Sequence, residues 1–217
     1  MIRKATGKRR PTARVARKRE QVRQEILAAA REILRQDGVE GVTLASVAAR
    51  LGMTKPALYH YFPSKEALVQ GLVVTLLDDE IETLIAAVEK SATRTDILGT
   101  LIRTFYAHYR DRLYALRTVY CRSQLGAAGQ IGLDQDTIRE QINPRTRHLF
   151  DVLETRIAGA GASAAERRRA RQLAYCAWLS ALGMLTMLGV AEANQDPLVH
   201  SDKDLLKVLS GVYSIEA

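Results

Sequence analysis

The segment TLASVAARLGMTKPALYHYFPSKEAL, residues 43–68, carries the clearest local structural signals in this chain. Leu44, Val47 and Leu51 recur at the spacing of one helix face. Thr43 precedes them and is a good N-cap, because its hydroxyl can accept from a backbone N–H of the first turn. Gly52 can take the left-handed backbone that closes a helix. We therefore predict a short helix from residue 44 that ends in a tight glycine turn.

A second short helix is predicted directly after this turn. Thr54 is its N-cap, and Pro56 falls in its first turn, where a missing N–H costs little. Pro63 ends it, because the residue before a proline is pushed out of the helical region. A helix this short is not stable alone. Its neighbours must hold it through Leu58 and Phe62, which are four residues apart on its inner face.

The outer face of this second helix carries Lys55, Tyr59 and His60. Exposed aromatic rings beside a lysine suit a helix that lies in a DNA major groove, with donors for phosphates and base edges. The alternative is a small helical hairpin packed only for stability. The DNA interpretation is favoured because the caps, the glycine turn and the outward aromatic residues agree with one another.

The run LGMTKPALYHYFPSKEAL resembles the recognition segment of the TetR family of bacterial transcriptional repressors. Members of that family carry a similar L-G-(small)-S/T-x-x-x-L-Y-x-H-F-x-S/N-K-E-x-L pattern. The resemblance covers about residues 22–72 by motif, and the rest only by length and helical character. Tyr61 stands where a histidine is frequent, which affects a backbone contact and not the fold.

This resemblance implies a twofold dimer that binds an inverted-repeat operator in double-stranded DNA, which also suits a recognition helix too short to read more than a few base pairs. It implies that Lys55 is the main base reader and that Tyr59, Thr43 and Lys65 hold the DNA backbone. The positions that match DNA-contacting positions of the family are Thr43, Thr54, Lys55, Ala57, Tyr59, His60 and Lys65.

Composition and length favour an all-α protein. The 217 residues are 47% hydrophobic, which is ample for a buried core, and runs of Ala, Leu, Arg and Glu are interrupted by few turn signals. We expect an N-terminal three-helix DNA-binding domain and a larger helical domain for ligand binding and dimerisation. The expected divisions are a basic arm at 1–19, the helix-turn-helix domain at 20–66 and the second domain at 67–217.

The positive charge is concentrated near the helix-turn-helix. The net charge is +8, and residues 1–70 hold fifteen Lys and Arg against six Asp and Glu. This asymmetry predicts a polyanionic partner and binding that weakens as salt rises. Residues 1–19 hold nine Lys and Arg and no acid, so we expect an arm that is disordered when free. It either follows the DNA backbone or minor groove, or is a solvated tail.

Further helices are expected along the rest of the chain. One spans Glu20–Gln36 and closes at Asp37-Gly38, and one starts after Ser64 and reaches residue 89 or 90. Later helices are expected from Thr95, over 114–125 and over 134–158, where Pro144 kinks or breaks the helix. The glycine-rich segment 125–132 is expected to be a flexible connection.

The segment 173–191 is nineteen residues without a charge, in a helix capped by Ser163. That length permits a membrane span. Burial between its own domain and a partner subunit is favoured, because the small residues Ala174, Ala177, Ala181 and Gly183 suit close helix packing. Together with a last helix from Ser201 or Asp202, this helix is expected to form the homodimer interface.

The resemblance also implies a pocket in the larger domain for a small-molecule effector. An aromatic lining suits a largely apolar or flat ligand, although the same side chains could fill a core. The candidate ligand-binding residues are Phe105, Tyr109, Tyr120, Phe150, Tyr175 and Trp178.

No enzyme motif accompanies these signals. None of the four histidines sits in a metal-ligand or nucleophile motif, so we expect no catalytic residue, no metal and no cofactor. Cys121 and Cys176 are expected to be core residues in a reduced cytoplasmic protein, because no signal peptide precedes the chain. The alternatives to a ligand-released repressor are a DNA-coating or architectural protein and a ligand-dependent activator.

Overall fold

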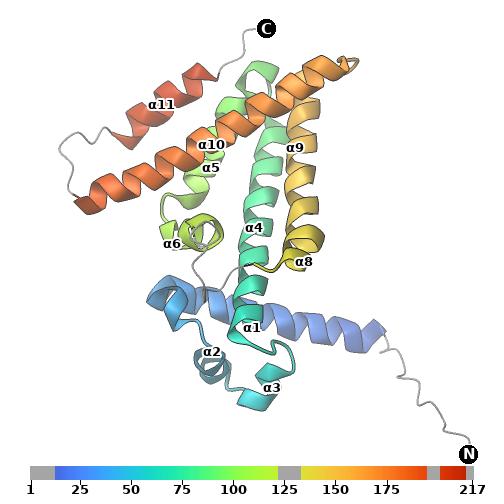
Figure 1. Cartoon of the computed structure of the whole chain (residues 1–217), viewed down its shortest axis with the longest axis vertical. Coiled ribbons are helices and arrows are strands. Elements are labelled where there is room, and N and C mark those ends of the chain that lie inside the picture. Colours follow the sequence, from blue (N-terminus) through green and yellow to red (C-terminus); the bar gives the residue numbers. More distant parts are fainter. Residues whose placement is uncertain (1–12, 122–132, 195–200, 214–217) are drawn as a thin grey trace, which may run out of the picture. The chain divides into compact units, whose positions relative to one another are not determined.

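The computed structural model describes residues 13–121, 133–194 and 201–213, and all regular elements in these ranges are helical (Figure 1). The expected all-α fold class is therefore confirmed. The chain divides into two compact units, Met1–Leu72 and Val73–Ala217. This division falls at residue 72, where the sequence led us to expect 66, so the first two turns of the long helix after Ser64 pack with the N-terminal unit.

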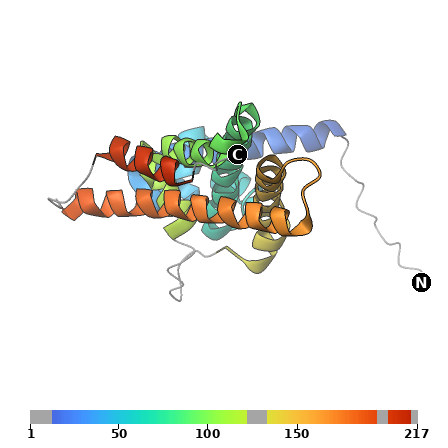
Figure 2. The ribbon, with the colours of Figure 1, turned by 90° about the horizontal axis from the view of Figure 1, so that it is seen from above.

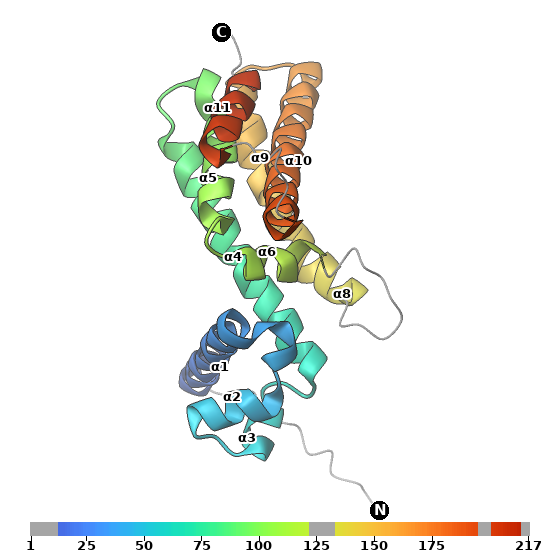
Figure 3. The same ribbon diagram turned by 90° about the vertical axis from the view of Figure 1, so that its left-hand side faces the viewer.

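The N-terminal unit contains α1 (Ala13–Gly41), α2 (Leu44–Leu51), α3 (Lys55–Tyr59) and the beginning of α4 (Lys65–Lys90). Within it, α2 packs against both α1 and α3 (Figure 3). The guanidinium of Arg23 lies over the Phe62 ring, 4.7 Å from its centroid. The buried side chains that form the core of this unit include Ile26, Ala30, Ile33, Leu34, Val42, Val47, Leu58, Phe62 and Leu68.

Helix α1 begins at Ala13, which corrects the expected start at Glu20 and the expected disorder of residues 13–19. Alanine and arginine are good helix formers, and extending an existing helix is easier than nucleating a new one. The exposed basic side chains remain in solvent, so they do not oppose the helix. Residues 1–12 of the expected arm lie outside the described residues.

The helix-turn-helix agrees closely with the sequence prediction. The Thr43 hydroxyl accepts from the Ser46 N–H at 3.0 Å, and the Ser46 hydroxyl accepts from the Thr43 N–H at 3.0 Å. Gly52 has φ 62°, in the left-handed region, and Thr54 caps α3 by accepting from the Ala57 N–H at 3.4 Å. The two caps and the glycine turn are thus confirmed.

Helix α3 is shorter than expected, because it ends at Tyr59 and does not continue to Pro63. The N–H groups of Tyr61 and Phe62 both donate to the Leu58 carbonyl, at 2.9 and 3.0 Å. These bonds tighten the chain into a turn before the proline.

The second unit contains the rest of α4 and the C-terminal helices. They are α5 (Ile97–Tyr109), α6 (Leu113–Leu116), a π-helical turn (Arg117–Cys121), α8 (Gln135–Thr137), a second π-helical turn (Ile138–Ile142), α9 (Asn143–Ala158), α10 (Ala164–Asn194) and α11 (Asp202–Val212). Helix α10 packs against α9 and α5, and α11 packs against α5 while running back beside α10 (Figure 2). The Ser180 and Tyr213 hydroxyls are hydrogen-bonded at 2.9 Å.

Several helix boundaries in this unit differ from the sequence prediction. Thr95 does not cap α5, because a 3-10 turn over Arg94–Asp96 comes first. Residues 135–158 are continuously helical, as expected, but the π-helical turn Ile138–Ile142 lies within this run, and Pro144 follows it in the first turn of α9. In the region expected as helix 114–125, the described part is α6 and the first π-helical turn. The glycine-rich segment 125–132 lies outside the described residues. Helix α8, which follows it, is capped by Asp134.

Helix α10 begins as predicted, since the Ser163 N–H donates to the Glu166 carboxylate at 2.7 Å and the Glu166 N–H donates to the Ser163 hydroxyl. Ala174, Ala177 and Ala181 are buried against the rest of the unit. Cys176 is exposed, so the prediction of a core cysteine is wrong there; it lies in an open groove between α9 and α10. No described helix is both long and apolar enough to cross a membrane.

Candidate nucleic-acid interface and ligand cavity

The exposed side of α3 carries most of the residues expected to meet DNA. Thr54, Lys55, Ala57, Tyr59 and His60 are all exposed, and Tyr59 retains 51% of its accessible surface. The opposite side is anchored, because Leu58 is completely buried. The fold thus holds a very short helix firmly and leaves its lysine and aromatic side chains available to a partner.

Thr43 and Lys65 are placed differently from the α3 residues. The Thr43 hydroxyl is half-buried and occupied by the cap of α2. The Lys65 ammonium lies 3.5 Å from a Glu40 carboxylate oxygen, and the Glu40 side chain is largely exposed. An ammonium has three donors, so Lys65 can bind a phosphate oxygen while it keeps this contact.

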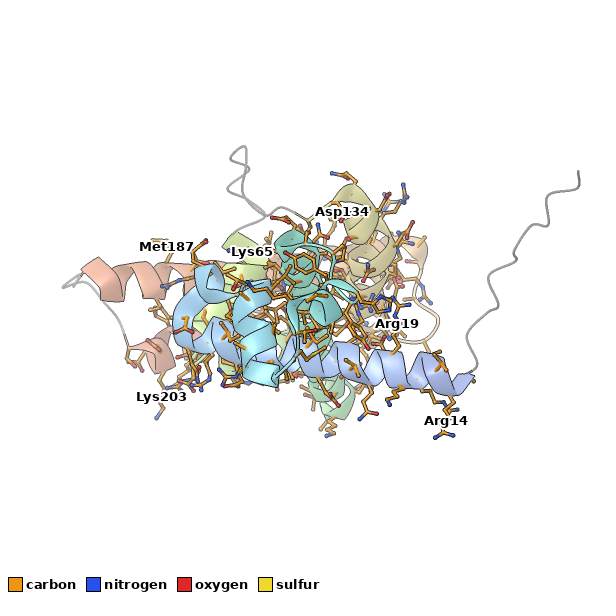
Figure 4. The ribbon with its side chains drawn as sticks, turned by 90° about the horizontal axis from the view of Figure 1, so that it is seen from below. Arg14, Arg19, Lys65, Asp134, Met187 and Lys203 are labelled. Carbon is orange, nitrogen blue, oxygen red and sulfur yellow. The ribbon has the colours of Figure 1, made fainter. Side chains whose placement is uncertain are left out.

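The structure adds Arg50 to the expected DNA contacts and shows two basic side chains of the segment expected as the arm. Arg50 is exposed in the last turn of α2, next to the glycine turn, and donates to the Gln36 side chain at 3.0 Å. Arg14 and Arg19 project from the N-terminal part of α1 (Figure 4). The signal for Arg50 was its position, since it is the one polar residue between Ser46 and the turn.

Comparison with known proteins places this arrangement in a family. The model of the family described as bacterial regulatory proteins, tetR family, matches residues 26–72. Residues 26–72 are a TetR-family segment. The matched residues contain all of α2 and α3 and the exposed face just described, so the TetR-family segment and the candidate interface coincide.

Similar proteins include regulators and a nucleoid factor. The chain is 29% identical over 136 residues to the nucleoid occlusion factor SlmA of Photobacterium profundum, which covers 62% of this chain and 64% of that protein. It is 24% identical over 135 residues to the class D tetracycline repressor protein of Escherichia coli, covering 60% and 56%. These alignments thus span less than two thirds of either relative.

The fold extends beyond the aligned sequence. A transcriptional regulator of the TetR/AcrR family from Thermobifida fusca superposes with a TM-score of 0.64, covering 89% of this chain and 96% of that one. The two are 19% identical, so this similarity concerns the fold alone. The C-terminal unit therefore shares its architecture with a protein of different sequence.

The C-terminal unit contains a partly open cavity of about 190 Å³. Of the candidate ligand-binding residues, Tyr120, Phe150 and Trp178 line it. Phe105 and Tyr109 are completely buried next to it, with Phe105 in edge contact with Tyr109. Tyr175 is exposed, in an outer groove between α9 and α10 that Phe150 also reaches. The cavity wall consists of Val73, Leu77, Glu80, Ile81, Val119, Tyr120, Leu133, Ile142, Thr146, Leu149, Phe150 and Trp178.

Glu80 is the polar centre of this cavity and was not selected from the sequence. It is only 1% exposed, and the Tyr109 hydroxyl donates to its Oε2 at 2.6 Å. The Tyr120 hydroxyl lies 2.7 Å from Oε1 and 2.6 Å from Oε2. Burial raises the pKa of Glu80 to about 7, against the opposing effect of hydrogen bonds from Tyr109, Tyr120 and Trp178.

A sequence signal for Glu80 does exist. Leu76, Glu80 and Leu84 are spaced four apart on one face of α4, so an acid stands within an apolar stripe. Within the described ranges, no three His, Cys, Asp or Glu side chains are grouped as a metal site requires.

Proposed function

We propose that this protein is a sequence-specific transcriptional regulator that binds an inverted repeat in double-stranded DNA as a homodimer. The exposed face of α3 carries the proposal, because Lys55, Tyr59 and His60 project from a helix that is capped and anchored as a DNA-reading helix must be. The description of the family as bacterial regulatory proteins supports it. Thr43, Thr54, Ala57 and Lys65 are the further proposed DNA contacts.

The proposed dimerisation follows from the short length of the recognition helix α3. A helix of five residues contacts few base pairs, whereas a genomic site must be longer, so two copies on two half-sites are needed. The proposed interface is formed by α10 and α11, whose exposed apolar side chains include Leu179, Met187, Val208 and Val212. Exposed apolar side chains of this kind on two neighbouring helices suit an interface with a second copy.

We further propose that a small molecule in the cavity controls DNA binding. Helix α4 is continuous from Lys65 to Lys90, so it carries both a proposed DNA contact and Glu80. A ligand that prefers one position of α4 therefore shifts the population of DNA-binding dimers. Release from the operator, as for a repressor, is the favoured direction, since the relatives include tetracycline repressor proteins. A ligand-dependent activator is the alternative.

Selection of bound sequences from random duplex DNA at physiological salt tests the DNA proposal. We expect enrichment of one inverted repeat whose half-sites are separated by about one helical turn or a multiple of it. Enrichment without a repeat would contradict a sequence-specific dimer.

A second candidate function is a nucleoid-binding role, which the similarity to SlmA supports. A nucleoid-binding protein differs from a transcriptional regulator in the number and distribution of its binding sites along the chromosome. Mapping of bound sites in cells separates the two, because a regulator occupies a few promoters, whereas a nucleoid factor occupies many dispersed sites.

A further inference from the structure

The cavity in the C-terminal unit is lined mainly by apolar side chains. Its aliphatic wall comes from α4, α9 and the two π-helical turns, and Phe150 and Trp178 add aromatic surface. A ligand that fills this space gains by removing apolar surface from water. The body of the ligand is therefore expected to be hydrocarbon or aromatic.

Glu80 is the only charged side chain among the described residues that line the cavity. In the part of the chain that the structure describes, no ion pair reaches its carboxylate, and its recorded partners are the Tyr109 and Tyr120 hydroxyls and the Trp178 indole. A buried carboxylate without a cation is costly, and the cost falls when a positive charge is placed beside it.

The carboxylate also keeps capacity for another donor. A carboxylate offers about four lone-pair positions, whereas Tyr109, Tyr120 and Trp178 bring one proton each. The Tyr120 hydroxyl is shared between both oxygens, so it leaves either one open at a given moment. Glu80 can therefore accept from a ligand without losing its present partners.

From this arrangement we infer that the cavity takes an amphipathic cation, with an apolar body against the cavity wall and a protonated nitrogen donating to Glu80. The inference rests on the proposed function, because it names the class of effector. Charge-assisted hydrogen bonds are about twice as strong as neutral ones, so an alcohol of the same shape binds less well. A ligand carboxylate is repelled by Glu80.

The test uses 4-phenylbutylamine, with 4-phenylbutanol as the neutral isostere and 4-phenylbutyrate as the anion. Trp178 is the only tryptophan of the chain and lies 5.6 Å from Tyr120 between ring centroids, so its fluorescence reports occupancy. We expect the amine to bind the wild-type protein at least about tenfold more tightly than the alcohol, and the anion to bind least. Equal binding of amine and alcohol, tightest binding of the anion, or no binding by any probe would overturn the inference.

Glu80→Gln removes the charge and keeps the size and an acceptor for the tyrosines. The amine should lose its advantage over the alcohol in this variant. Glu82→Gln is the matched control, because Glu82 is exposed on the same helix. It should leave the preference unchanged, and a preference retained in Glu80→Gln would refute the role of Glu80.

The number of protons released on binding can be measured in the wild-type protein itself. At pH 7 the amine stays charged, so protons released on binding come from the protein, and calorimetry in buffers of different ionisation enthalpy counts them. We expect release in the wild type and none in Glu80→Gln, which separates Glu80 from His108, whose ring lies against Tyr109. Zero release in the wild type would contradict the inference.

Operator binding measured with and without the amine separates the two proposals. If the amine binds through Glu80 and operator affinity is unchanged, the effector role fails and the cation preference stands. If occupancy by the neutral alcohol changes operator affinity as strongly as the amine does at equal saturation, the effector role stands and charge does not select it.

Discussion

Lys55 is the residue on which sequence recognition depends most in this proposal. It lies at the first position of α3, exposed, beside the cap residue Thr54 and clear of the core. Its side chain is therefore available to DNA and contributes little to the stability of the fold.

Lys55→Ala should weaken binding to the selected operator by roughly tenfold or more, as loss of a base contact does. The thermal midpoint should change little, because the side chain is in solvent. Fluorescence anisotropy with labelled operator measures the first and calorimetry the second. Lys90→Ala, at the exposed end of α4, is the control and should bind normally. Unchanged operator affinity in Lys55→Ala would remove Lys55 from the interface.

Glu80 makes stability depend on pH with an unusual sign. The pKa of its carboxyl is about 7 in the folded chain, against an ordinary value of 4.5, because burial disfavours the charge. Between these values the folded chain holds a proton that the unfolded chain has lost. The free energy of unfolding therefore falls as pH rises from 4.5 through 7, by about 3 kcal/mol for this group. The pKa values of Tyr109 and Tyr120 are raised, so neither ionises in this window.

Denaturation by urea at pH 5 and pH 8, at one protein concentration, measures this effect. Glu80→Gln should resemble the wild type at pH 5 and be the more stable protein at pH 8. Glu82→Gln is again the control, because the Glu82 side chain is exposed. Parallel pH profiles for the wild type and Glu80→Gln would show that Glu80 is not responsible.

At the scale of elements, the glycine turn sets the direction of α3 relative to α2. Gly52 has φ 62°, and a Cβ added there meets nothing within 4 Å. Only backbone strain therefore opposes a substitution at this position.

Gly52→Ala should lower the free energy of unfolding by about 1 kcal/mol. Gly52→Asn should cost less, because asparagine tolerates the left-handed region better. Both can be compared by thermal denaturation of the whole protein. Equal losses for alanine and asparagine would mean that the backbone conformation is not the cause.

Helices with caps and breakers near their ends were predicted well from the sequence. Thr43, Gly52, Thr54 and Ser163 act through bonds to backbone groups a few residues away, so their signals are local. The start of α1 was misplaced because net charge was taken as a sign of disorder, whereas arginine in solvent is compatible with a helix. The expected helix over 134–158 is present from residue 135, and Pro144 does not end it.

For the whole molecule, the exposed faces of α10 and α11 predict a homodimer. Leu179 is 45% exposed and Val212 is 72% exposed, and burying both against a second copy recovers apolar surface. A dimer would also place two recognition helices on one operator.

The double variant Leu179→Glu and Val212→Glu should be monomeric in sedimentation velocity at micromolar concentration. It should lose most of its affinity for a two-half-site operator, because two linked reading helices bind far more tightly than one. Val15→Glu is the control for sedimentation only, since Val15 is 55% exposed on α1 in the other unit but lies in the basic segment. A double variant that sediments as the wild type does would place the interface elsewhere.

The sequence alone was sufficient for the all-α fold, the capped helix-turn-helix and the exposed side of α3, because these depend on neighbours a few residues apart. The cavity was different. Tyr120, Phe150 and Trp178 line it, while Tyr109 is buried beside it and Tyr175 is outside, although all five are aromatic residues at similar helical spacings. Only packing between distant helices separates these cases, and it alone brings Tyr109 and Tyr120 to Glu80, 29 and 40 residues away.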